Sequence, residues 1–357
     1  ARIYTFDSLN ENYYYLLMLL AIIFAYFSWR FFENPFRNKN KTSIKFLTFS
    51  IIGMTCFFVL ISSLTIKNNG FSERYDLDEN IIKTLTIDHN EDCFAIEYAH
   101  SSSKWGCDLG NINSKADYNF VLFGDSHANT YAKKINEFAL KNNKKGFFTG
   151  INGCPPLIDI KPFDPPGGPF NCEKLNKRIL DFVKKNKIEN IILVARWSYY
   201  THGDFNQQDI RFLKTENFTK KELKSSQKAF TEGLKKTIEI YEQNGVKVNL
   251  IKQYPQQRIN PKDLFYRKFN GSNFPELIQK YSISKEKNDE LNSFANNLFS
   301  DISYENLNLI DFNSSFCISK CLIGDQNGSY YYDDDHLSDY GMSLIADEIE
   351  NLIISLN

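Results

Sequence analysis

Two long apolar runs near the start of the chain constrain its fold more than any other feature. Residues 13–32 carry a single charge, Arg30, near their end, and residues 46–66 carry none. Each run has about 20 residues, and a helix of that length crosses a hydrocarbon core of about 30 Å. A buried core helix is the alternative for each run, but two runs joined by a short polar loop favour a transmembrane hairpin. A signal peptide fits less well, because it would have one shorter apolar region.

The polar loop between the two runs is basic and orients the hairpin. It contains Arg37, Lys39, Lys41 and Lys45, and loops rich in Lys and Arg face the cytoplasm. Both ends of the hairpin then lie on the outer side. We therefore expect everything after residue 66 to be extracytoplasmic.

The cysteines agree with an oxidising compartment. Cys56 lies within the second apolar run, and six cysteines follow it. An even number outside the cytoplasm favours disulfides. A zinc site at Cys317 and Cys321 is a weak alternative, because no His or second Cys pair lies nearby in the sequence. Separations along the chain favour the pairs Cys93 with Cys107, Cys154 with Cys172, and Cys317 with Cys321.

The charge balance argues against a nucleic-acid partner. The chain has 42 Lys and Arg against 43 Asp and Glu, a net charge of −1. No global basic field is therefore available to displace counterions from a phosphate backbone.

Beyond the hairpin, the pattern predicts an α/β domain. Residues 67–116 are polar and irregular, and we interpret them as a linker or extension that holds Cys93 and Cys107. From 117 to 357 short apolar runs alternate with amphipathic ones, as in βα units with a mostly parallel sheet. The expected strands are 119–123, 146–149, 190–195, 246–252 and 307–311, and the expected helices about 126–142, 172–187, 225–244, 285–300 and 338–355.

The loop after the first expected strand reads Gly124-Asp125-Ser126-His127. A serine at the start of a helix lies beside unpaired backbone N–H groups, which can stabilise an oxyanion formed next to it. Gly-Asp-Ser is equally good chemistry for a turn and a helix N-cap. The motif alone leaves both interpretations open.

A second motif, Asp333-Asp334-Asp335-His336, precedes the last expected helix. An Asp three residues before a His can reach the imidazole Nδ1–H, which leaves Nε2 free to take a proton from a hydroxyl. This spacing favours Asp333 as the orienting acid, with Asp334 and Asp335 as alternatives. A capping or surface histidine after an acidic turn is the structural alternative for His336.

Together the two motifs resemble the SGNH/GDSL hydrolase family, which has an early GDS block and a late DxxH block. The resemblance implies a three-layer α/β/α fold over about 117–356, with Ser126 as nucleophile, His336 as general base and Asp333 as its orienting acid. It also implies an oxyanion hole formed by the N–H groups of Ser126 and Gly153. The chain departs from the family where a third block usually supplies an Asn, because it has Ala195-Arg196-Trp197 there. Arg196 is one candidate replacement.

Residues 28–37, Ser-Trp-Arg-Phe-Phe-Glu-Asn-Pro-Phe-Arg, resemble the end of the core of acyltransferase-3 membrane proteins. An ordinary membrane-interface stretch is the alternative. A further expected membrane helix and an SGNH-like domain with an Ala-Arg-Trp third block follow these residues. This arrangement resembles the fused acyltransferase-3/SGNH proteins that O-acetylate bacterial surface glycans. Residues 1–66 would then be the tail of the membrane domain, and a start at Ala1 without Met is what a fragment of a longer protein would show.

This resemblance implies an O-acyltransferase that modifies a glycan such as lipopolysaccharide O-antigen through an acyl-Ser126 intermediate. It also implies a bacterial inner membrane as the location, with the catalytic domain in the periplasm. Acetyl-CoA would be the ultimate donor through the upstream acyltransferase-3 domain, and we expect no cofactor or metal bound by this segment. A membrane-tethered carbohydrate esterase or deacetylase with the same triad is the alternative, and a non-catalytic glycan-binding module is a third hypothesis. The aromatic residues Trp197, Tyr199 and Tyr200 are candidates for a sugar-binding wall, with loop packing as the alternative.

Overall fold

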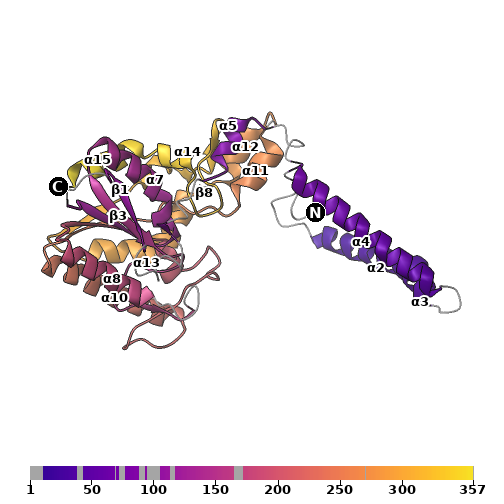
Figure 1. Cartoon of the computed structure of the whole chain (residues 1–357), viewed down its shortest axis with the longest axis horizontal. Helices are drawn as coiled ribbons and strands as arrows, with labels where there is room; N and C mark the ends of the chain where they lie inside the picture. Colours follow the sequence, from indigo (N-terminus) through magenta and orange to yellow (C-terminus); the bar gives the residue numbers. More distant parts are fainter. Residues whose placement is uncertain are drawn as a thin grey trace. The chain divides into compact units, whose positions relative to one another are not determined.

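The computed structural model describes residues 11–37, 43–68, 70–71, 77–87, 93–94, 105–112, 117–164, 172–269 and 271–356. It divides the chain into two compact units, residues 1–76 and 77–357. Figure 1 shows the elements of each unit.

The first unit is helical. Helix α2 covers Glu11–Ser28 and continues through a π-helical turn, η1 (Trp29–Glu33), into the short α3 (Asn34–Arg37); α4 covers Ile44–Lys67. Residues 14–31 and 44–67 are long and apolar enough to cross a membrane, and neither stretch is buried within the protein. Two exposed apolar helices of this length indicate membrane anchoring. Lys39 and Lys41 of the expected cytoplasmic loop lie outside the described residues.

The second unit is built on a six-stranded sheet with the strand order β1-β3-β2-β5-β7-β9. All strands are parallel except β1, which pairs antiparallel with β3. The predicted mostly parallel sheet is therefore confirmed. Its strands are β1 (Cys107–Gly110), β2 (Phe120–Gly124), β3 (Lys145–Gly150), β5 (Asn190–Val194), β7 (Lys247–Ile251) and β9 (Leu307–Ile310).

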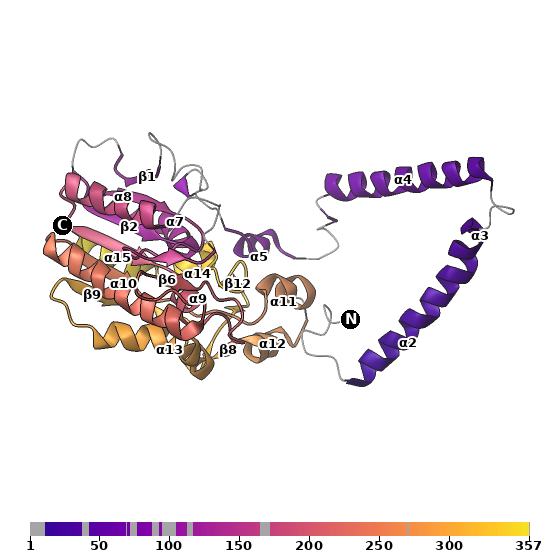
Figure 2. The ribbon, with the colours of Figure 1, turned by 90° about the horizontal axis from the view of Figure 1, so that it is seen from below.

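Helices cover both faces of this sheet, which confirms the three-layer α/β/α arrangement. One face packs against α7 (Ser126–Lys141) and α15 (Ala346–Ser355), and the other against α8 (Cys172–Lys185), α10 (Leu223–Gln243) and α13 (Lys285–Asp301). Figure 2 views the second face. Strand β2 is buried throughout because its alternate side chains enter the two cores: Phe120 and Leu122 one, Val121 and Phe123 the other.

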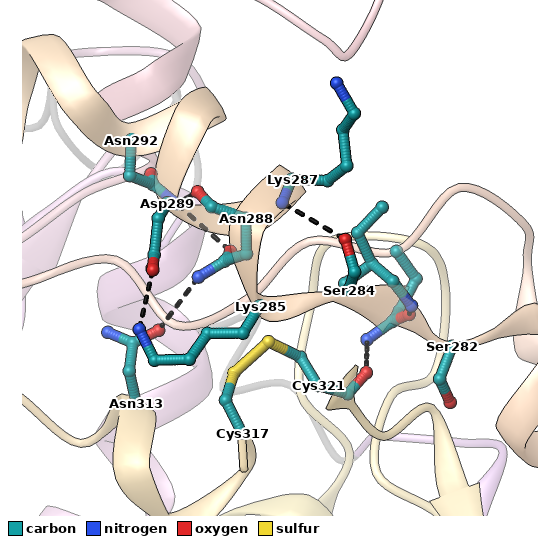
Figure 3. Close-up of a disulfide and its surroundings, with 12 residues drawn as sticks. Ser282, Ser284, Lys285, Lys287, Asn288, Asp289, Asn292, Asn313, Cys317 and Cys321 are labelled. Carbon is teal, nitrogen blue, oxygen red and sulfur yellow. Dashed lines mark hydrogen bonds and ion pairs between the residues drawn. A yellow bond between two sulfur atoms is a disulfide. The ribbon is translucent and has the colours of Figure 1, made fainter. Parts of the chain in front are cut away.

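Strand β1 is part of the sheet although it lies within residues 67–116, the expected linker. Its first residue, Cys107, forms a disulfide with Cys93. The other two disulfides join Cys154 to Cys172 and Cys317 to Cys321, so all three pairs are those favoured by the sequence separations. The Cys317–Cys321 bridge lies beside the start of α13 (Figure 3), and it removes the thiolates that a zinc site would need.

Several short elements have no counterpart in the sequence pattern. Helix α5 (Glu79–Thr84) packs on β12 (Gly328–Ser329), where Thr84 Oγ1 accepts the N–H of Ser329 at 2.9 Å. The expected helix 338–355 is divided into α14 (Asp339–Ser343) and α15, because Ile345 leaves the helical conformation at φ −117°, ψ 19°. The remaining elements are β4 (Lys161–Pro162), α9 (Trp197–Thr201), β6 (Leu213–Lys214), α11 (Pro261–Lys268), α12 (Phe274–Tyr281), β8 (Ile283–Ser284), η4 (Asn313–Ser315), β10 (Lys320–Cys321) and β11 (Gly324–Asp325).

Candidate active site

The strand order identifies the carboxyl ends of β2 and β5 as the expected location of a ligand-binding site. From β2 the chain proceeds first to β3 on one side and then to β5 on the other, so the winding reverses at the β2–β5 pair. Ligands of open α/β sheets bind at such a reversal. The loop with Ser126 follows β2, and the loop with Arg196 follows β5. A Cβ atom on Gly124 would lie 1.7 Å from the carbonyl oxygen of Val194, so only glycine allows the two strand ends to approach this closely.

Asp125 anchors the turn that carries Ser126. Its side chain is buried and caps α7 by accepting the N–H of His127 at 3.0 Å. The same carboxylate accepts the backbone N–H of Arg196 at 3.0 Å and the hydroxyl of Tyr200 at 2.7 Å. Ser126 is thereby held as the first residue of α7, where the N–H groups of the first helical turn lack intrahelical partners.

The acidic loop holds His336 through Asp333. One oxygen of Asp333 accepts the backbone N–H groups of Asp335 at 3.0 Å and of His336 at 2.7 Å, which closes the loop. Both oxygens of Asp333 lie near the imidazole Nδ1 of His336, at 3.0 and 2.9 Å. Nε2 is buried and has no hydrogen-bond partner among the residues that the structure describes. A neutral His336 with its proton on Nδ1 would therefore have Nε2 available to accept a proton.

A second carboxylate, that of Asp335, also reaches His336. Its Oδ1 lies 3.1 Å from Nδ1. Burial of the ring by itself lowers the pKa of His336, but the carboxylates of Asp333 and Asp335 outweigh burial and raise the pKa to about 10. The third acidic residue, Asp334, has a raised pKa because it is buried beside two other carboxylates. Asp334 is fixed through its backbone oxygen, which accepts the N–H of Gln257 at 2.7 Å.

His127 links the two motifs in space. It follows Ser126, its ring stacks on Tyr254 with centroids 4.6 Å apart, and its centroid lies 5.2 Å from that of His336. Complete burial lowers the pKa of His127. The structure therefore brings the early and late motifs into contact through the rings of His127 and His336. Sequence reasoning did not single out His127. Its position inside the GDSH motif was the only available signal.

Gly153, the expected second oxyanion donor, lies in the loop after β3. Its φ of +64° is a conformation that glycine adopts without strain. A Cβ atom there would approach the Arg211 guanidinium, with Nη2 at 3.1 Å. Glycine at this position thus leaves room for the Arg211 side chain.

The guanidinium of Arg196, a candidate to replace the missing Asn as an oxyanion donor, is already paired with other side chains. Its Nη1 is 3.1 Å from both Asp209 and Asp335, and its Nη2 donates to Gln256 at 3.3 Å. The guanidinium also lies over the ring of Tyr199, 4.9 Å from the centroid. Arg196 as an oxyanion donor stays a prediction, and its side chain is engaged elsewhere in this arrangement.

The expected sugar-binding wall is wrong for two of its three residues. Trp197 is 1% exposed, and its indole N–H donates to the carbonyl of Ile251 at 2.8 Å. Tyr200 is fully buried and bonds to Asp125. Both point into the protein because α9 begins immediately after β5 and turns these positions into the core. Tyr199 is partly exposed and remains a candidate contact for a ligand.

The same side chains contain two groups with metal-ligating atoms. His127, Asp335 and His336 form one, and Asp333, Asp334 and Asp335 the other, each with ligand atoms within 4.8 Å of one another. The guanidinium of Arg196 pairs with Asp335 in both groups. A positive charge at this position opposes the binding of a cation.

A family model described as "SGNH domain (fused to AT3 domains)" matches residues 92–351. The chain belongs to this family. The matched range thus includes β1 and α14 and ends within α15. A search of curated protein sequences finds no match.

Among solved structures, the SGNH domain resembles the periplasmic domain of the lipopolysaccharide acetyltransferase of Salmonella ser. Paratyphi A, at 16% identity and a TM-score of 0.49 over 69% of this chain and 87% of that one. It also resembles a GDSL-like lipase of Bacteroides thetaiotaomicron, at 11% identity and a TM-score of 0.38 over 66% and 86% of the two chains. A carbohydrate acetylesterase of Sinorhizobium meliloti is similar at 12% identity and a TM-score of 0.35, over 67% and 99%.

Proposed function

We propose that this SGNH domain is an O-acyltransferase that moves an acetyl group onto a hydroxyl of a bacterial surface glycan, such as lipopolysaccharide O-antigen, through an acyl-Ser126 intermediate. The observation that carries the proposal is the pairing of His336 Nδ1 with Asp333 at 2.9 Å beside the helix start that presents Ser126, with Nε2 left unbonded among the described residues. A serine, a histidine and an orienting acid form the unit that activates a hydroxyl for acyl transfer.

In the first half-reaction, Ser126 Oγ attacks the carbonyl carbon of the donor while Nε2 of His336 takes the hydroxyl proton. The carbonyl oxygen becomes an oxyanion, which the N–H groups of Ser126 and Gly153 would stabilise. When the bond to the donor breaks, the leaving group takes the proton from His336. The acetyl group is then an ester of Ser126.

In the second half-reaction, a glycan hydroxyl replaces the leaving group. His336 accepts its proton, the sugar oxygen attacks the acetyl carbon, and the proton returns to Ser126 as its ester bond breaks. Water in place of the sugar would make the enzyme an esterase or deacetylase, which is the second candidate. The triad is the same in both cases, so its geometry does not separate them.

Fusion to an AT3 domain, which the family description contains, favours transfer over hydrolysis. A donor delivered by a tethered membrane domain reaches the SGNH domain at high effective concentration. The two exposed apolar helices support such an arrangement at a bacterial inner membrane, with the SGNH domain in the periplasm. Acetyl-CoA would supply the acetyl group by way of the membrane domain, and a surface or lipid-linked glycan would accept it.

The test is to acetylate the detergent-solubilised chain with 4-nitrophenyl acetate, trap acetyl-Ser126 and follow its decay with and without glycan. Decay accelerated by glycan, with formation of O-acetylated sugar, supports the transferase. Ser126→Ala should form no intermediate. Decay unchanged by every glycan offered, together with release of acetate from acetylated polysaccharide, would instead establish the esterase.

A further inference from the structure

One carboxylate, that of Asp335, contacts three cationic or titratable groups from three parts of the fold. Its Oδ1 lies 3.1 Å from Nδ1 of His336 in the acidic loop. Its Oδ2 lies 3.1 Å from Nη1 of Arg196, after β5, and 3.5 Å from Nε2 of His127, on α7. The Asp335 side chain is only 9% exposed, so water screens these interactions weakly.

Arg196 is fixed at both of its ends. Its backbone N–H donates to Asp125, the residue that caps the helix of the proposed nucleophile. Its guanidinium is held by Asp209, Gln256 and the ring of Tyr199 as well as by Asp335. A continuous chain of contacts therefore runs from the turn that carries Ser126, through Arg196 and Asp335, to the imidazole of His336.

We propose that Asp335 is a second acidic partner of His336, and that Arg196 is a positioning residue that holds Asp335 against the imidazole and offsets its charge. This inference deepens the proposed function and rests on it for the role of His336 as base. Arg196, which stands where the family usually has the oxyanion-binding Asn, would then position Asp335 instead of binding the oxyanion. Arg196 would act on the reaction only through Asp335.

Electrostatics explain why two acids on one imidazole need a cation. Each carboxylate favours the imidazolium form, and a base must be neutral to accept a proton. Among the residues that the structure describes, the groups facing His336 are the three aspartates of its own loop, Tyr332 and the buried His127 on α7. The ring centroid of Tyr332 lies 5.4 Å from that of His336. Lys262 on α11 lies over Tyr332, 5.3 Å from its centroid. Arg196 is the cation that directly contacts one of the two acids on Nδ1, so its removal should strengthen the hold of Asp335 on the proton.

The experiment measures the protonation of His336 and needs no turnover. The full chain is labelled with 13C at histidine Cε1, solubilised in detergent and titrated by NMR; it contains five histidines, and His336→Ala assigns the signal. Asp335→Asn should lower the pKa of His336 by about one unit or more. Arg196→Met should shift it in the opposite direction, so that at pH 9.5 the neutral fraction falls severalfold.

Three further variants separate positioning from a general loss of structure. Arg211→Met is the matched control, because Arg211 also lies over Tyr199, at 5.4 Å from its centroid, and should leave the titration of His336 unchanged. Arg196→Lys keeps a positive charge and should lie between wild type and Arg196→Met. In the Asp335→Asn background, Arg196→Met should lose its effect on the titration.

The coupling of Arg196 to His336 through Asp335 is established if Asp335→Asn and Arg196→Met shift the pKa of His336 in opposite directions, and if Arg196→Met has no effect in the Asp335→Asn background. Equal titration curves for wild type, Asp335→Asn and Arg196→Met, or shifts of the same sign in both variants, would overturn it. Because the readout is the titration of one ring, failure of the acyl-transfer proposal would appear separately, as an absent acetyl-Ser126 in the wild-type chain.

Discussion

Replacing Asp333 by Asn should slow acylation of Ser126 by about 10- to 100-fold. The amide oxygen of Asn can still accept the backbone N–H groups that Asp333 binds at 3.0 and 2.7 Å, so the loop should keep its shape. What is lost is one of two carboxylates on Nδ1 of His336. A hydrogen bond to a charged group contributes about 1.5–3 kcal/mol, and each 1.4 kcal/mol or so changes a rate about tenfold.

The loss should be this moderate because Asp335 remains 3.1 Å from the same nitrogen. With Asp333→Asn and Asp335→Asn combined, neither of the two described carboxylates within hydrogen-bonding distance of Nδ1 remains to keep the proton there. The decrease should then approach about 10⁴-fold, as expected when a catalytic histidine loses its orienting acid. The combined effect should therefore exceed that of Asp333→Asn by about two orders of magnitude or more.

The assay is the burst of 4-nitrophenolate as 4-nitrophenyl acetate acylates the full chain. Removing a carboxylate also lowers the pKa of His336, so complete pH profiles must be recorded and their plateaus compared. Asp334→Asn is the matched control, since Asp334 is not within hydrogen-bonding contact of Nδ1 in the structure, and it should change the plateau little. If Asp334→Asn were the most damaging change, Asp333 would not be the orienting acid. If Asp333→Asn alone lowered the plateau rate as much as the combined variant, Asp335 would not contribute to orienting the His336 imidazole.

Four further expectations follow from the structure. Ester cleavage should rise with pH toward about 10, because His336 must lose a proton to act as base; a rate already maximal at pH 6 would contradict its raised pKa. The contribution of His336 to folding stability should be complete below about pH 6.5 and be lost as pH rises through about 10, which thermal unfolding against pH measures in comparison with His336→Ala. Trp197→Phe should destabilise the domain by about 2–4 kcal/mol in denaturant unfolding, because it leaves a cavity and removes the hydrogen bond to the Ile251 carbonyl. Lost glycan binding at unchanged stability would restore the sugar-wall role. A periplasm-dependent reporter should be active at the C-terminus and inactive near Lys39, and the reverse pattern would invert the proposed topology.

The sequence alone determined the features that depend on local pattern. Alternating apolar and amphipathic runs predicted the parallel strands and their covering helices, because hydrophobic period follows from the geometry of each element. Two runs of membrane-spanning length predicted α2 and α4, and short separations favoured the three disulfide pairs. The spacing of Asp333 and His336 predicted their contact, because three residues in one loop leave little freedom.

Only the tertiary structure decided which distant residues meet. Strand order, the reversal at β2 and β5, and the addition of β1 depend on pairings between segments far apart in the chain, which local periodicity does not encode. The direction of Trp197 and Tyr200 depends on where α9 turns after β5, so their aromatic character alone suggested a surface role that burial excludes. The ion pair between Arg196 and Asp335 joins positions 139 residues apart and exists because the loop after β5 and the loop before α14 meet in the folded domain.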